Sequence, residues 1–170
     1  SSSEKKWVAL SGEGEYKIGQ FDGLTFKPET NIQKLDFGKN FYATQTLFNA
    51  PNGKVIQIAW MRGGEFPDMA FNGQMSIPTE LTLRSTKKGT VLCRKPIEEL
   101  STLNDKEIRK KGKNLIPGIK GNLLNGMKGD AVRINAVLQL KSSDSFGFIV
   151  RSGKTGNGTD IHYDTAKKIL

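Results

Sequence analysis

Apolar and polar positions alternate in short segments along most of the chain, which predicts strands rather than long helices. In the first 95 residues, the segments predicted as strands are 6–10, 15–21, 24–26, 41–48, 55–61, 75–77, 80–84 and 90–94. Turn residues separate them, as at Asp22-Gly23 and Pro51-Asn52-Gly53, and such dipeptides favour hairpins. Antiparallel strands joined by hairpins at this spacing indicate a propeller blade or a sheet of a sandwich.

The pattern changes after residue 95. Residues 96–113 are polar and rich in Glu, Lys and Leu, with Ile97, Leu100 and Leu103 spaced for one face of a helix. Strands return further on, predicted at 131–140, 146–150 and 160–163, with the start of another at 168–170. We therefore expect an all-β chain in three parts: a first domain at 1–95, a linker at 96–118 and a second domain at 119–170.

Composition limits the class of protein. The chain has 170 residues with a hydrophobic share of 36%, which suits one domain or pieces of two. It opens on SSSEKKWVAL, without methionine or a signal-like segment, so we expect an interior start within a longer protein. The sequence contains no run of about 18 apolar residues, so no membrane span is predicted. The single cysteine, Cys93, cannot form an internal disulfide and is interpreted as a small apolar side chain on a strand.

The net charge of +9 raises the question of a nucleic-acid partner. Basic residues are densest at 106–113, and that segment contains no aromatic residue. Surfaces that bind nucleic acid usually combine basic side chains with aromatic rings that stack on bases. A solvated linker is the better interpretation, and we predict no nucleic-acid partner.

The stretch 36–84 carries the candidate binding residues, because it places Tyr42 and Trp60 near strand ends. It contains no nucleophile–base pair, metal cluster or phosphate-binding loop. His162, the only histidine, is predicted to be an exposed strand residue, so no metal site and no cofactor are expected. The stretch therefore predicts one wall of a binding site without catalytic groups.

Four carboxylates of this stretch are candidates for a catalytic pair: Asp36, Glu65, Asp68 and Glu80. Catalysis by a pair of carboxylates needs both groups placed close together in one site. Each of the four is explained more simply as a turn, rim or structural residue. No catalytic residue is therefore predicted within the chain.

Several segments resemble glycoside hydrolase family 32, the β-fructosidases that include invertases, inulinases and levanases. Asp36-Phe37-Gly38-Lys39-Asn40-Phe41-Tyr42-Ala43 is similar to the segment in which the family usually has Asp-Phe-Tyr-Ala, and Ile58-Ala59-Trp60-Met61 is similar to its Gly-Trp-Met strand. Further similar segments are 7–10, 16–23, 72–81 and 96–100. They follow one another in the family's order over nearly the whole chain.

The resemblance implies the last part of a five-bladed β-propeller, followed by part of a β-sandwich. It also implies a retaining double displacement by carboxylates that lie in earlier blades. The family's catalytic motifs, Asn-Asp-Pro-Asn, Arg-Asp-Pro and Glu-Cys, do not occur in the 170 residues. At Asn104-Asp105, for example, Lys106 stands where the motif has proline.

The resemblance further implies that Tyr42 and Trp60 border a fructosyl unit. Without the resemblance, Tyr42 and Trp60 would be interpreted as aromatic residues packed between blades. Asn40 replaces the usual aspartate and keeps a hydrogen-bonding tip but loses the charge, so it is the third predicted substrate-binding residue. Arg62, Glu65 and Asp68 would line the rim beyond the first sugar.

We therefore expect a piece of a β-fructosidase that acts on sucrose, levan or inulin and is inactive by itself. The alternatives are a non-catalytic carbohydrate-binding or assembly piece and a fructosyltransferase relative. A polysaccharide-degrading parent would be extracellular or periplasmic. Incomplete sheets leave strand edges unpaired, so self-association through those edges is also predicted.

Overall fold

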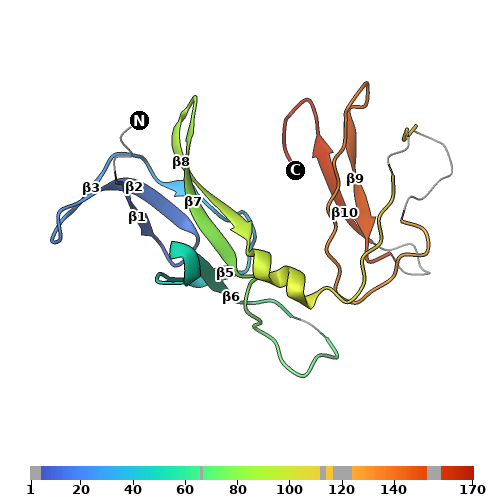
Figure 1. Ribbon diagram of the computed structural model, residues 1–170, viewed down its shortest axis with the longest axis horizontal. Coiled ribbons are helices and arrows are strands. Elements are labelled where there is room, and N and C mark those ends of the chain that lie inside the picture. The colour runs from blue at the N-terminus through green and yellow to red at the C-terminus, as the bar shows by residue number, and fades with distance from the viewer. Residues whose placement is uncertain (1–4, 66, 112–113, 117–123, 153–157) are drawn as a thin grey trace. The chain divides into compact units, whose positions relative to one another are not determined.

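The structure is a computed structural model and describes residues 5–65, 67–111, 114–116, 124–152 and 158–170. The described residues form strands joined by turns, with two short 3-10 helices (Figure 1). The prediction of an all-β chain is confirmed. The chain divides into two compact units, Ser1–Arg109 and Lys110–Leu170.

The first sheet of the N-terminal unit is built around one long central strand. Strand β2 (Glu15–Phe21) pairs with β1 (Trp7–Leu10), β3 (Phe26–Pro28) and β4 (Gln33–Lys34), all antiparallel. The β2–β3 turn is closed by the Asp22 carboxylate, which accepts hydrogen bonds from the backbone N–H groups of Thr25 (2.7 Å) and Leu24 (2.9 Å). These bonds favour the ionised form and lower the pKa of Asp22.

The second sheet is a meander of consecutive strands, in the order β5–β6–β7–β8 (Figure 1). These strands are β5 (Phe41–Leu47), β6 (Ile56–Met61), β7 (Thr79–Thr86) and β8 (Gly89–Pro96). The 3-10 helix η1 (Pro51–Gly53) lies in the β5–β6 connection, and η2 (Glu98–Leu103) follows β8. A four-stranded antiparallel meander is the arrangement of one propeller blade.

A small apolar cluster joins the two sheets. Tyr16 and Ile18 of β2 are buried with Leu35 and with Leu92 of β8. The Tyr16 hydroxyl accepts a hydrogen bond from the Leu92 backbone N–H (3.1 Å) and donates one to Gln33 Oε1 (2.9 Å). This buried hydroxyl is therefore satisfied by both sheets, which fixes how β2 lies against β8.

Among the described residues of the C-terminal unit, β9 (Ser145–Val150) and β10 (Thr159–Asp164) form an antiparallel hairpin. The predicted strands at 146–150 and 160–163 are confirmed. The loop predicted between them falls largely on 153–157, outside the described residues.

Three expectations about strands are wrong. Residues 131–140 form no strand, and Val132 is 67% exposed. An alternating segment becomes a strand only where another strand pairs with it, and β9 and β10 pair with each other instead. Residues 168–170 and 75–77 each contribute only one bridge, Asp164–Ile169 and Trp60–Met75. In the segment 96–113, where the spacing of Ile97, Leu100 and Leu103 suits one face of a helix, the described residues form the short 3-10 helix η2.

Within the part of the chain that is described, no helix has the length and apolar character needed to span a membrane.

Candidate functional site

Tyr42 and Trp60 lie directly opposite each other on neighbouring strands. Tyr42 of β5 pairs with Trp60 of β6 in the antiparallel ladder, so both side chains project from the same face of the sheet. Their rings meet edge to face, with centroids 6.3 Å apart and an interplanar angle of 63°. Trp60 is 40% exposed, whereas Tyr42 is half-buried. The two aromatic residues predicted for the site are thus brought together.

A bulge in β5 directly follows Tyr42. The register between β5 and β6 shifts between Tyr42 and Gln45, and Ala43 has a φ of 48°. Bulges bend a strand and re-aim the neighbouring side chains. The orientation of Tyr42 toward Trp60 therefore depends on this local irregularity.

Arg62 covers one face of the tyrosine ring. Its guanidinium carbon lies 3.6 Å from the centroid of the Tyr42 ring, which is the geometry of a cation–π contact. Arg62 follows the end of β6 and is exposed. The site therefore combines an exposed indole with guanidinium N–H donors, which suits a ligand that has both apolar faces and hydroxyl groups.

The segment 73–76 lies beside Trp60 and pairs with the backbone of β6 around it. Met75 forms a bridge with Trp60, the Met61 N–H donates to the Gln74 carbonyl (2.8 Å), and the Ser76 N–H donates to the Ala59 carbonyl (2.7 Å). Gly73 has a φ of +74°, and a Cβ added there would lie 2.7 Å from Trp60 Nε1. Glycine at this position thus lets the backbone approach the indole.

Replacing Gly73 by alanine is expected to displace the Trp60 ring. Gly63 is a suitable control, because its φ is +75° and an added Cβ there would meet nothing within 4 Å. Each substitution should cost about 1 kcal/mol through the positive φ, but only Gly73→Ala should alter the Trp60 signal. Tryptophan fluorescence in a Trp7→Phe background measures this, and identical spectra for the two variants would contradict the expectation.

Asn40 is half-buried and directly precedes β5. Beside Tyr42 the structure has a pocket of about 280 Å³ whose lining is mostly polar and includes Arg62. Its other lining residues are Glu13, Glu15, Lys34, Asp36, Phe37, Gly38, Lys39 and Phe41. Asn40 is therefore next in sequence to residues that line this pocket.

The four candidate carboxylates of the stretch 36–84 occupy different surroundings. Asp36 forms an ion pair with Arg94, and Glu80 lies on β7 opposite Ile56 of β6. Glu65 and Asp68 are exposed in the β6–β7 connection, where Asp68 has a φ of 68°. These placements agree with turn, rim and structural roles.

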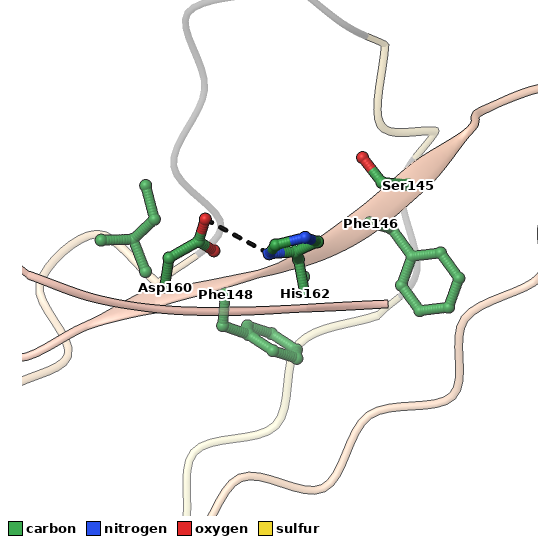
Figure 2. Close-up of a pocket in the computed structure, with 7 residues that line it drawn as sticks. Ser145, Phe146, Phe148, Asp160 and His162 are labelled. Carbon is green, nitrogen blue, oxygen red and sulfur yellow. Dashed lines mark ion pairs between the residues drawn. The ribbon is translucent and has the colours of Figure 1, made fainter. Parts of the chain in front are cut away.

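A second hollow, of about 340 Å³, lies on the C-terminal hairpin (Figure 2). It is lined by residues of β9 together with Asp160 and His162 of β10. His162 Nδ1 lies 3.4 Å from Asp160 Oδ2, and both side chains are exposed. The prediction that His162 is an exposed strand residue is confirmed. Nowhere in the described ranges do three or more His, Cys, Asp or Glu side chains form a group that could hold a metal ion.

Sequence reasoning missed two residues next to the first site: Arg94, which contacts Asp36 and Phe41, and Gly73, which lies against Trp60. Arg94 lies on β8, 58 residues after its partner Asp36, and no local motif connects them. For Gly73, the asparagine–glycine pair at 72–73 is a turn signal, but it does not say which side chain the turn approaches.

Comparison with known families gives one match that covers more than half of the chain. The sequence model described as "Glycosyl hydrolases family 32 N-terminal domain" matches residues 4–96. This range contains both sheets of the N-terminal unit and the aromatic pair.

Curated relatives extend the similarity to nearly the whole chain. A levanase of Bacillus subtilis is 33% identical to the chain; the match covers 95% of this chain and 27% of the levanase. A levanase of Bacillus sp. strain L7 is 32% identical, and the match covers 97% of this chain and 20% of that levanase. An extracellular exo-inulinase of Meyerozyma guilliermondii is 28% identical, and the match covers 92% of this chain and 32% of the exo-inulinase. The chain thus spans about a fifth to a third of the length of these relatives.

Among solved structures, a Bombyx mori family 32 β-fructofuranosidase is similar to the chain with a TM-score of 0.44. It has 30% identity over 56% of this chain and 20% of that protein.

Proposed function

The chain belongs to glycoside hydrolase family 32, whose N-terminal domain is a β-propeller, and we propose that it forms part of a β-fructosidase acting on sucrose, levan or inulin. In this proposal Tyr42, Trp60 and Asn40 contact the substrate as one wall of the sugar site. The catalytic carboxylates are supplied from outside this chain. The C-terminal residues, 119–170, belong to a β-sandwich domain that follows a linker at 96–118.

The observation that carries the proposal is the pair of Tyr42 and Trp60 within the family match, with the Trp60 indole exposed. A fructosyl unit presents C–H groups on its faces and hydroxyl groups at its edges. The Trp60 indole can pack against such a face, while the Tyr42 hydroxyl and the Arg62 guanidinium can hydrogen-bond to the edge. The names of the relatives, levanase and exo-inulinase, support fructose polymers as the ligand class.

Asn40 adds a neutral amide to this wall. An amide can both donate to and accept from sugar hydroxyl groups. Unlike a carboxylate, it cannot raise or lower the pKa of a neighbouring acid through its own charge. Its proposed role is therefore orientation of the sugar rather than control of proton transfer.

The proposed mechanism is a retaining double displacement. One carboxylate attacks the anomeric carbon while a carboxylic acid protonates the leaving oxygen, and water then hydrolyses the covalent fructosyl–enzyme. This chain contributes to both steps by holding the sugar ring in place. The family's catalytic motifs are missing from its sequence, so it contributes no nucleophile or acid.

We expect the chain by itself to release no fructose from sucrose, inulin or levan, yet to bind fructo-oligosaccharides. Binding should change the Trp60 fluorescence of a Trp7→Phe variant on titration with 1-kestose, with maltotriose as the control sugar. Fructose release would contradict the assignment of the carboxylates to other parts of the enzyme. Equal responses to the two sugars would contradict the proposed site.

A non-catalytic carbohydrate-binding role is the second candidate. It is favoured by the exposed Trp60 in a chain that lacks the catalytic motifs. The two candidates predict different results when the chain is combined with the remaining part of a family 32 enzyme. Fructose release should return only if this chain forms part of the catalytic site. Self-association through unpaired strand edges stays a prediction.

A further inference from the structure

A partly buried ion pair lies next to the proposed sugar wall. Asp36 accepts a hydrogen bond from Arg94 Nη2, and the two side chains are 12% and 28% exposed, respectively. The other carboxylate oxygen, Oδ1, accepts the backbone N–H of Gly38 at 2.7 Å. Asp36 thus ties its own loop to strand β8 and also closes the turn that leads to Asn40.

This pair is part of a junction between the two sheets. The backbone N–H groups of Leu35 and Asp36 donate to the Gly14 carbonyl at 2.8 and 3.4 Å, which fastens the loop to the turn before β2. Gly14 has a φ of +77°, and a Cβ there would lie 2.9 Å from the Phe41 ring and 3.0 Å from Asp36 Cβ. The loop is therefore held from the first sheet as well as from β8.

The same junction reaches the aromatic wall through Phe41. The Arg94 guanidinium lies over the Phe41 ring, 4.9 Å from its centroid, and Phe41 is buried directly before Tyr42. Asp36, Phe41, Tyr42 and Arg62 all line the pocket of about 280 Å³. Movement of the Asp36 loop would therefore be transmitted to Asn40 and Tyr42.

From this arrangement we propose that Asp36 and Arg94 are positioning residues, which set Asn40 and Tyr42 in the geometry that the sugar wall requires. The inference rests on the proposed function for its effect on ligand binding. Neither side chain needs to touch the sugar, because the pair acts through the loop and through Phe41. A binding group must be held within about 0.5 Å of its productive position by such supporting contacts.

A purely structural role is the competing explanation, and a second ion pair of the N-terminal unit provides the control. Lys54 Nζ lies 2.8 Å from Glu99 Oε1 and joins the segment before β6 to η2. Neither residue lines the pocket beside Tyr42. Loss of this pair removes an ion pair without disturbing the Asp36 loop.

The test uses the Trp7→Phe chain labelled with 5-fluorotryptophan, in which Trp60 gives the only fluorine resonance. Asp36→Asn and Arg94→Met remove one charge each, Arg94→Lys keeps the charge, and Glu99→Gln is the control. We expect Asp36→Asn and Arg94→Met to shift or broaden the Trp60 resonance, because its neighbour Tyr42 moves. Arg94→Lys should restore part of the original signal, and Glu99→Gln should leave it unchanged.

Titration with 1-kestose adds the functional readout. Asp36→Asn and Arg94→Met should weaken binding about fivefold, the equivalent of roughly one lost hydrogen bond, with Glu99→Gln binding normally. An unchanged Trp60 resonance in both variants would overturn the positioning role, whatever their stability. If the Trp7→Phe chain does not bind 1-kestose, the proposed function fails, while the ligand-free resonance still decides the positioning role.

Discussion

Replacing Trp60 by alanine is expected to weaken binding of fructo-oligosaccharides about thirtyfold, because an aromatic side chain that the bound ligand covers contributes about 2 kcal/mol. Trp60 offers the exposed indole of the wall, and its 40% exposure leaves it accessible to a ligand. Calorimetric titration with 1-kestose measures the loss without relying on the removed fluorophore. Tyr42 would keep the Arg62 guanidinium over its ring but lose the Trp60 ring that it meets edge to face.

Trp7 provides a matched control for this substitution. It is also exposed and also forms an edge-to-face pair, with Phe21 at 5.2 Å, but in the first sheet. Trp7→Ala should therefore leave the affinity for 1-kestose unchanged. The sugar wall would be misassigned if Trp60→Ala bound normally, or if the two variants lost affinity equally.

Replacing Ile18 by alanine should lower the unfolding free energy of the N-terminal unit by about 3 kcal/mol. Ile18 is 1% exposed and packs in the cluster that joins β2 to β8. The loss has two parts: the transfer free energy of the deleted methyl and methylene groups and the cavity that they leave. This is a large share of the 5–15 kcal/mol that a folded domain usually has.

Ile32→Ala is the control for this prediction, because Ile32 is 59% exposed. It should change the unfolding free energy by no more than about 0.5 kcal/mol. Urea denaturation followed by tryptophan fluorescence compares both variants with the unmodified chain. Equal losses would mean that the cluster around Ile18 does not hold the two sheets together.

The strands of the first 95 residues were largely predictable. Residues 15–21 were predicted as a strand and form β2 with the same bounds, because side chains of a strand alternate between two faces within a few residues. The segment 131–140 has an equally regular alternation but forms no strand. The difference is that β2 has three pairing neighbours, and the presence of a pairing edge cannot be inferred from the segment itself.

The candidate site was predictable only in part. Tyr42 and Trp60 stood out because of their residue type and their place near strand ends, and the structure sets them opposite each other. The register shift after Tyr42 and the guanidinium of Arg62 over the tyrosine ring were not visible in the sequence. They depend on how two strands align, which the alternation of polar and apolar residues within each strand does not determine.

The sequence by itself determined the strand-and-turn composition of the chain, its family resemblance and the absence of the family's catalytic motifs. These properties depend on residue type and on spacing over a few positions. Only the tertiary structure decided that Arg94 pairs with Asp36, 58 residues earlier, and that Gly73 lies against the Trp60 indole. Such contacts arise when separate strands and loops pack together, so local sequence carries no signal for them.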